Sequence, residues 1–457
     1  MKKTLVLILV LAMIAGFAAA CAGNQPAQTP SGPAATQAPA ATQAPAATQA
    51  PAAPAEDEPV LLRVTWWGNQ LRHETTVAML DAFTELNPHI TFEPEFTDWS
   101  GYWDKLATQA ASNNLPDIVQ QDYAYITQYH TRGLMANLTD QINLGNLNVD
   151  NVPESILATG RFDGDLYALC IGVNAVCIIY NEDALDAAGV TMPERPSYQE
   201  IMDISAAVFA DSGMRGHTPR NHQGLQMMAR DRGEIVYGGT GDQTLQASEA
   251  TVLRYFTQIQ TTAQSDWSFT TDMHLANITA GLEGHSMTIG HGWNLYPGGS
   301  NQLAGAQNAT EANLGIALYP RTDGYTHEAM YLRPSQFFSI SSTSPHQDIA
   351  ARVIDFYTND EIAQDHLMAE RGVPVSTVMA DYLRPKLAPV QQKIFAYIAS
   401  VAAIATPFDP PQPNGAAEVN TLLEQLTDLI EFGQMTPEDA TARFMTEANE
   451  IFARAAD

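Results

Sequence analysis

Aromatic and amide side chains recur where the sequence predicts strands to end, and they are the residues best suited to ligand chemistry. Trp67 closes one strand-like run and Asn69 follows it, while Gln121 and Asp122 follow another such run. Flat rings pack against apolar C–H surfaces, amides donate and accept hydrogen bonds, and carboxylates accept them. These residue types favour the noncovalent recognition of a hydroxyl-rich solute.

Patterns typical of catalysis or of metal binding are missing from the sequence. It contains no G-x-S-x-G turn, no H-E-x-x-H helix and no glycine-rich phosphate loop. Retaining glycosidases need two carboxylates about 5 Å apart, and nothing marks a pair such as Asp98 and Asp122 as matched in this way. His217 and His222 are spaced too loosely for a recognisable metal site. We therefore expect no enzyme, no cofactor and no metal.

The first 20 residues have the pattern of an export signal. Met1-Lys2-Lys3 precedes an apolar run from Leu5 to Ile14, which is shorter than the roughly 20 residues of a membrane-spanning helix. The small residues that lead to Cys21 resemble the lipobox of bacterial lipoproteins, although Ala18 replaces the more usual leucine. We expect cleavage before Cys21, lipidation of that cysteine and attachment to the outer face of the cell membrane. The alternative is an ordinary secretory signal in which Cys21 is incidental.

Residues 21–58 are predicted to be a disordered tether. The hexapeptide Pro-Ala-Ala-Thr-Gln-Ala begins at Pro33 and recurs from Pro39 and Pro45. It offers no large side chain to bury, so it cannot offset the entropy of ordering. As a semi-rigid spacer it reaches on the order of 100 Å at most.

Length and charge narrow the class of protein. The roughly 400 residues after the tether are enough for two domains. The chain has 51 acidic and 22 basic residues and a net charge of −29, which disfavours nucleic acid as a partner.

Cys170 and Cys177 are seven positions apart, or about 23 Å in extended chain. A disulfide would require the chain to reverse near Gly172. Buried free thiols are the favoured interpretation, and a disulfide stays the alternative.

The body of the chain alternates predicted strands and helices. Val77, Leu80, Phe83 and Leu86 recur at helical spacing, and Pro88 ends that helix. A second helix is expected at residues 102–111, and helices are expected near the C-terminus. Strands are predicted at residues 60–64, 90–96, 118–119, 177–180, 286–290 and 337–340. Strand and helix alternation over the first 60 residues of the body predicts a parallel sheet with crossover helices and an edge strand at 90–96.

Several motifs in series resemble those of bacterial extracellular solute-binding proteins of sugar-importing ABC transporters, the group that includes maltose-binding protein. The resemblance covers residues 60 to 455. Its motifs are Leu62–Trp67, Leu115–Val119 with Gly133-Leu134, Gly164–Ala168, Tyr180–Leu185 with Ala188–Val190, and Gly281–Ile289 with Gly292-Trp293.

The resemblance implies an α/β, periplasmic-binding-protein-like fold of two discontinuous lobes joined by a hinge, with a helical C-terminal region. Lobe I is expected at residues 59–172 plus 335–384, and lobe II at 173–334 plus 385–457. The implied protein is a monomer that binds a mono- or oligosaccharide between its lobes and delivers it to an ABC permease with a cytoplasmic ATPase. The membrane is touched through the lipid anchor only.

The resemblance also suggests which residues meet the ligand. Trp293 matches the family's stacking aromatic. Simple packing or helix capping remains the alternative at each position. The predicted ligand-binding residues are Trp293, Trp67, Asn69, Gln121, Asp122, Asn174, Trp99, Arg333 and Glu418.

Two other functions stay open at this point. One is the same fold binding a polyamine or a glycerol-phosphate ester, which would need more carboxylates or more cationic groups in the cleft. The other is a surface lipoprotein that senses or adheres to glycans without transport.

Overall fold

The computed structural model describes residues 58–216, 219–238, 244–269, 273, 293–308 and 310–456. The predicted signal peptide, Cys21, nearly all of the predicted tether and the strand predicted at 286–290 lie outside the described residues, as does the side chain of Trp293. Residues Asp57–Asp457 form one unit. Within its described part, no helix has both the length and the apolar character that a membrane crossing requires.

The first sheet has five strands in the order β2-β1-β3-β11-β6. Its strands are β1 (Val60–Trp67), β2 (Ile90–Thr97), β3 (Ile118–Gln121), β6 (Leu169–Asn174) and β11 (Arg333–Ile340). Strand β1 pairs in parallel with both β2 and β3. Helices α1 (Gln70–Leu86) and α2 (Trp99–Ala111) connect these three strands, so the predicted parallel unit and its edge strand are confirmed.

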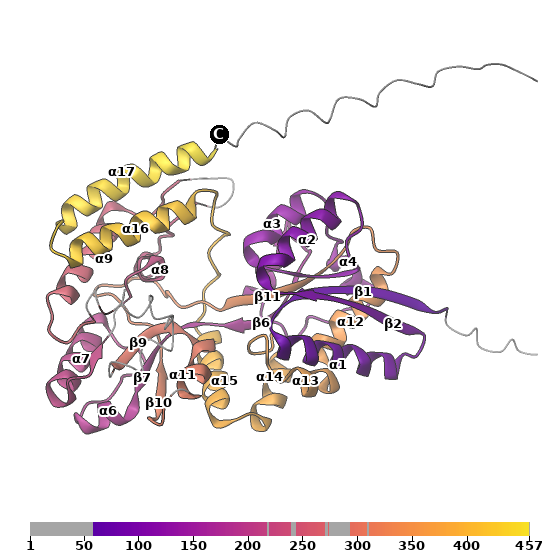
Figure 1. Cartoon of the computed structure of the whole chain (residues 1–457), viewed down its shortest axis with the longest axis horizontal. Helices are drawn as coiled ribbons and strands as arrows, with labels where there is room; N and C mark the ends of the chain where they lie inside the picture. The colour runs from indigo at the N-terminus through magenta and orange to yellow at the C-terminus, as the bar shows by residue number, and fades with distance from the viewer. Residues whose placement is uncertain are drawn as a thin grey trace, which may run out of the picture. The chain divides into compact units, whose positions relative to one another are not determined.

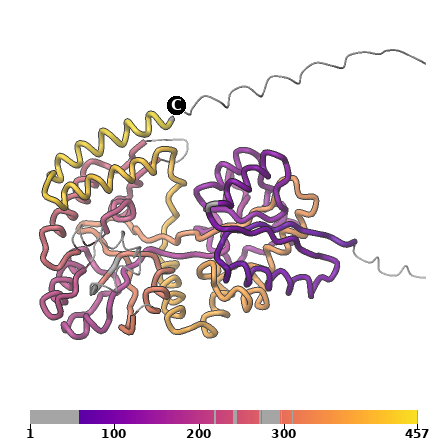
Figure 2. Tube along the Cα trace, viewed as in Figure 1, coloured from indigo at the N-terminus to yellow at the C-terminus, as the bar shows by residue number. Residues whose placement is uncertain are grey.

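Strand β11 returns to this sheet from late in the chain and runs antiparallel to both β3 and β6. In Figure 2 its orange trace runs among the indigo segments of the first third of the chain. The sheet is therefore mixed.

The second sheet has four strands in the order β10-β7-β9-β8. They are β7 (Val176–Asn181), β8 (Arg215–Gly216), β9 (Trp293–Gly299) and β10 (Leu314–Ala317). This sheet is mixed as well, because β7 pairs antiparallel with both β9 and β10, whereas β8 pairs in parallel with β9. Strands β9 and β10 form a crossover unit through α11 (Leu303–Asn308), and β7 inserts between them from the other direction.

The chain passes from one sheet to the other at Ala175, which separates β6 from β7 (Figure 1). Gly172 precedes this passage in tight packing, since a Cβ there would lie 2.4 Å from the carbonyl oxygen of Arg371. Cys170 and Cys177 flank the passage as buried free thiols, which confirms the favoured interpretation. Burial raises the pKa of Cys170 to about 12.

The C-terminal part of the chain is helical, as the sequence predicts, and it shares a hydrophobic core with earlier helices. Helices α16 (Ala416–Glu431) and α17 (Pro437–Ala456) pack against each other and against α9 (Glu249–Ala263), and α16 also packs against α8 (His222–Arg230) (Figure 1). Val419, Leu422 and Leu426 are buried in this cluster.

The remaining elements are helices, short turns and a separate two-stranded sheet of β4 and β5. They are α3 (Tyr123–Thr131), α4 (Leu138–Asn143), α5 (Glu154–Leu157), β4 (Arg161–Phe162), β5 (Asp165–Leu166), α6 (Glu182–Ala187), α7 (Tyr198–Ser212), α12 (Gln347–Asn359), α13 (Glu361–Leu367), α14 (Thr377–Leu383) and α15 (Pro389–Ala402), with short 3-10 turns at Ala158–Gly160, Ser300–Gln302 and Arg384–Lys386.

Candidate ligand-binding cavity

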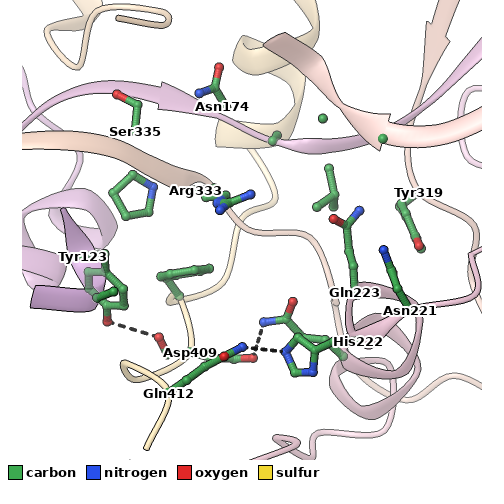
Figure 3. A pocket seen from close by; sticks show the side chains of 18 of the residues that line it. Tyr123, Asn174, Asn221, His222, Gln223, Tyr319, Arg333, Ser335, Asp409 and Gln412 are labelled. Carbon is green, nitrogen blue, oxygen red and sulfur yellow. Dashed lines mark hydrogen bonds between the residues drawn. The ribbon is translucent and has the colours of Figure 1, made fainter. Parts of the chain in front are cut away.

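A cavity of about 730 Å³ is lined by residues from both sheets and from the loops beside them (Figure 3). Its walls come from the start of α3, the passage at 174–176, the turn after β9, the first half of β11, the start of α8 and the segment 408–412. This volume lies within the range of about 300–1,000 Å³ that is typical of small-molecule sites.

Side-chain amides dominate the polar lining. They are Asn174, Asn221, Gln223, Gln226, Asn301, Gln302, Gln336 and Gln412. Some are engaged within the protein: Gln226 donates from Nε2 to Asp409 at 2.7 Å. Others are open, since the buried Oε1 of Gln336 has no hydrogen-bond partner within the described part of the chain. Amides of this kind can donate to and accept from several hydroxyl groups of one ligand.

Aromatic rings supply the apolar part of the lining. They are Tyr123, His222, Tyr237, Tyr319 and Phe408. His222 and Tyr237 are stacked, with ring centroids 5.0 Å apart and planes at 11°. The hydroxyl of Tyr123 donates to the backbone oxygen of Asp409 at 3.1 Å, which holds the 408–412 segment against the start of α3 (Figure 3).

His222 is a neutral aromatic group at neutral pH. Burial lowers its pKa to about 4. The amide nitrogen of Gln412 lies 3.0 Å from Nε2 of His222, so the amide donates and the ring accepts. The other ring nitrogen, Nδ1, has no hydrogen-bond partner among the described residues.

Two of the charged groups in the lining are neutralised by the protein. Asp409 forms an ion pair with the buried Arg230, which also donates to the backbone oxygen of Ala329 at 2.8 Å. Arg220 lies 2.8 Å from both Asp428 and Glu431. These pairs fix the cavity wall and leave little net charge for a ligand to balance.

Asp122 and Arg333 are the remaining charged groups of the described lining. Asp122 caps α3, because its Oδ1 accepts the backbone N–H of Ala124 at 2.9 Å. Burial raises the pKa of Asp122, while Ala124 and the charge of Arg333 oppose that rise. Arg333 is exposed and pairs through its backbone with Asn174 across β6 and β11.

Three of the predicted site residues, Asp122, Asn174 and Arg333, line this cavity (Figure 3 labels the last two). Asp122 follows the strand predicted at 118–119, Arg333 precedes the strand predicted at 337–340, and Asn174 was suggested by the family resemblance. Of Trp293, the structure describes only that it begins β9.

Five predicted residues lie outside the cavity lining, and each has a described position. Asn69 caps α1 by accepting the N–H of Arg72 at 3.0 Å. Gln121 is buried, and its Oε1 has no partner among the described residues. Glu418 is exposed and forms an ion pair with Arg454 at 2.8 Å. Trp67 and Trp99 belong to an aromatic cluster described next.

The aromatic cluster consists of Trp67, Trp99, Tyr102, Trp103 and Tyr125. Trp67 is 7% exposed and contacts Trp99, Tyr102 and Trp103 at centroid distances of 5.0, 5.1 and 5.5 Å. Trp66 is also buried, although alternation along a strand directs it to the other face. Both faces of β1 are thus covered by aromatic groups at this end.

Asp98 and Asp122 both act as helix caps. Asp98 accepts the N–H of Gly101 at 2.9 Å at the start of α2, as Asp122 accepts that of Ala124 at the start of α3. Capping of helix N-termini by aspartate is a common structural role. It accounts for both residues without a catalytic pair.

Sequence reasoning missed the cavity residues that come from loops and from α8. Tyr237, Gln223, Gln412 and Asp409 follow no strand-end pattern. The one local signal was the proline-rich run that includes Pro410 and Pro411, which predicts irregular chain but says nothing about what it lies against.

A fold of two sheets that share one cavity, lined by amides and rings, defines a protein that binds a small solute. The family comparison agrees: residues 78–394 match the model of the bacterial extracellular solute-binding proteins, and the chain belongs to that family. It is an extracellular solute-binding protein.

Solved structures share this fold over most of the chain. An extracellular solute-binding protein of family 1 from Alicyclobacillus acidocaldarius is 27% identical, with a TM-score of 0.78, over 87% of this chain and 100% of that one. A periplasmic oligogalacturonide binding protein from Yersinia enterocolitica is 20% identical, with a TM-score of 0.71 and the same coverage. An ABC substrate-binding protein from Listeria monocytogenes, in complex with cycloalternan, is 15% identical, with a TM-score of 0.67 and again the same coverage. At these last two identities the likeness concerns the fold alone.

Proposed function

We propose that this protein captures a mono- or oligosaccharide in the cavity and delivers it to an ABC permease. The observation that carries the proposal is the lining, which combines eight amide side chains with five aromatic groups while two of its charges are paired internally. Sugars present apolar C–H faces and many hydroxyls, and this set complements both. One structural relative is named as an oligogalacturonide binding protein, and another is described in complex with cycloalternan.

A polyamine fits this lining less well. The described carboxylates in the lining are Asp122 and Asp409, and Asp409 is already paired with Arg230. Burying a polycation needs a carboxylate for each ammonium group. One free carboxylate does not meet that need.

The lobes and the anchor belong to the same proposal. Lobe I comprises residues 59–172 plus 335–384 and lobe II residues 173–334 plus 385–457, each built around one of the two sheets. Rotation about the passage at Ala175 closes the lobes on the ligand, because the ligand binds the closed state more tightly. Lipidation at Cys21 and the tether that follows hold the protein at the outer face of the membrane. A glycan-sensing lipoprotein would share all of this but need no permease, so ligand uptake that depends on a permease distinguishes the two.

Within the site, Asp122, Asn174 and Arg333 contact the ligand directly, and Trp293 stacks on a sugar ring. Trp67, Asn69, Gln121, Trp99 and Glu418 stay predictions. All of them except Gln121 have described structural roles: Asn69 as a helix cap, Trp67 and Trp99 in aromatic packing, and Glu418 in an ion pair.

The test is a thermal-shift screen of the mature chain, residues 21–457, against saccharides, polyamines, amino acids and glycerol phosphodiesters. A ligand at about 100 times its dissociation constant adds about 2.7 kcal/mol to the free energy of unfolding. Stabilisation by a saccharide is the expected result. Stabilisation by polyamines alone contradicts the proposal.

Variants of the cavity residues test whether that ligand binds in this cavity. Asn174→Ala should weaken saccharide binding about 2- to 10-fold through the loss of neutral hydrogen bonds, and Trp293→Ala should weaken it through the loss of stacking. Asn151→Ala is the matched control, because Asn151 is exposed and outside the cavity lining. Equal affinities for all four proteins would remove the ligand from this cavity.

A further inference from the structure

Some charged side chains in the described cavity lining are already paired within the protein, and one cationic group is not. The guanidinium of Arg220 forms ion pairs with Asp428 and Glu431. The carboxylate of Asp409 forms an ion pair with Arg230 and accepts a hydrogen bond from Gln226. Arg333 forms no side-chain hydrogen bond or ion pair with any described residue. Its guanidinium is the cationic group of the described lining that remains to be paired.

The acidic composition of the chain makes it notable that Arg333 has no described carboxylate partner. The chain has 51 acidic residues against 22 basic ones, so carboxylate partners are abundant. Half-buried arginines elsewhere use them, as Arg72 does with Glu370 and Arg195 with Glu328. An arginine that faces a cavity without such a partner keeps all five N–H donors for a ligand.

The backbone at Arg333 is held firmly. Strand β11 places Arg333 opposite Asn174 in β6, and the residues on either side, Leu332 and Pro334, are buried. The hydroxyl of Ser335 donates to the backbone oxygen of Gly172 at 2.7 Å and ties the same two strands. The guanidinium therefore extends from a fixed backbone, so binding an anion orders the Arg333 side chain but no further backbone.

Asp122 does not neutralise Arg333. One oxygen of Asp122 accepts the N–H of Ala124 at 2.9 Å, and no ion pair links the two side chains. Asp122 is nonetheless close enough for the charge of Arg333 to lower its pKa. The pair presents a hydroxyl acceptor and a cationic fork side by side on one wall.

We propose that Arg333 binds the carboxylate of an acidic saccharide, so that the solute of this protein is a uronate-containing sugar rather than a neutral one. This inference rests on the proposed saccharide function and narrows it. A single guanidinium matches the two oxygens of a carboxylate in a bidentate pair, whereas a phosphate dianion would leave one charge without a partner. The surrounding amides, such as Asn174 and Gln336, then bind the hydroxyls of the same ligand.

The experiment is titration calorimetry of the mature chain with matched disaccharides. The probes are digalacturonic acid and cellobiouronic acid, each beside the neutral disaccharide of the same linkage. At least one uronate should bind at least 10-fold more tightly than its neutral counterpart. In Arg333→Gln the ratio of acidic to neutral affinity should fall about 10- to 100-fold, because charged hydrogen bonds are lost.

Two further variants make the result specific. Arg333→Lys should recover part of the preference, since it keeps the charge but loses the planar fork. Arg132→Gln is the matched control, because Arg132 is exposed at the end of α3 and outside the cavity lining. It should leave both affinities unchanged.

The outcomes separate this inference from the proposed function. Neutral disaccharides that bind as tightly as the uronates, or no uronate binding at all, overturn the role of Arg333 and leave a neutral-sugar function standing. A preference for uronates that survives in Arg333→Gln also overturns it. Failure of every saccharide in the thermal-shift screen, with binding of another solute class, overturns the proposed function itself.

Discussion

The aromatic cluster and the cavity are both rich in rings, yet they use them differently. In the cluster each ring contacts other rings: Trp103 stacks on Tyr125 at 3.8 Å and 17°, and Trp99 meets Trp67 edge-on at 80°. In the cavity, His222 and Tyr123 also contact rings, Tyr237 and Phe408, but each has a polar partner in the 408–412 segment: Gln412 donates to His222, and Tyr123 donates to the backbone of Asp409. The comparison teaches that contact between rings does not by itself distinguish a packed cluster from a cavity wall, whereas hydrogen bonds from the rings to polar loop residues do separate these two regions.

Truncation of Trp67 is expected to have the largest effect among the variants that test this comparison. If the cluster is packing, Trp67→Ala should lower the free energy of unfolding by about 3–5 kcal/mol, the usual cost of removing a buried tryptophan. Chemical unfolding measures the loss. The affinity of the remaining folded protein for its saccharide should change less than 3-fold.

Trp99→Ala is the matched variant, because Trp99 belongs to the same cluster but is 46% exposed. Trp99→Ala should lower the free energy of unfolding by less than half as much as Trp67→Ala, because Trp99 buries less apolar surface on folding. A loss of ligand binding in Trp67→Ala without a loss of stability would make the cluster part of the binding site.

The second prediction concerns the cavity and tests whether the His222 ring is buried in its wall. Its pKa is about 4 in the folded protein, against an ordinary value of 6.5. Between these values the unfolded chain binds a proton that the folded chain does not, so the free energy of unfolding falls as the pH drops through the window. In His222→Gln, the difference in this free energy between pH 7 and pH 5 should shrink by roughly 2 kcal/mol.

The control for this experiment is Asn151→Ala, which replaces an exposed residue outside the cavity lining and changes no titratable group. Unfolding by urea at both pH values should show an unchanged pH dependence in that variant. An unchanged dependence in His222→Gln as well would mean that the His222 ring is solvated in solution rather than buried beside Tyr237.

Much of the fold follows from local patterns. Strand β1, helix α1 and strand β2 are each specified within a short window, and Pro88 limits α1 by steric exclusion. The direction of strands in the second sheet was not predictable, because β7 enters between β9 and β10 from another part of the chain. That arrangement depends on pairings more than 100 residues apart, which no local periodicity encodes.

The site divides in the same way. Asp122 was predictable as a cavity residue because it follows a predicted strand, and strand ends of α/β sheets converge on ligand sites. Asn174 was suggested by the family resemblance instead. Gln223, Tyr237 and Gln412 reach the cavity through the packing of α8 and the 408–412 segment, which Arg230 and Asp409 hold in place. Those contacts join segments almost 180 residues apart, so their signal lies in the tertiary structure alone.

The smallest expected effect concerns Glu418, which the sequence suggested as a contact at the rim of the site. The structure pairs it with Arg454 across α16 and α17, with the two side chains 63% and 61% exposed. Exposed pairs contribute about 0–1 kcal/mol, so Glu418→Gln should lower the free energy of unfolding by less than about 1 kcal/mol and leave ligand affinity unchanged. A double-mutant cycle with Arg454→Gln measures the pair, and its coupling should vanish at 1 M salt. A 10-fold loss of ligand affinity in Glu418→Gln would instead extend the binding site to α16, beyond the loops that line the cavity.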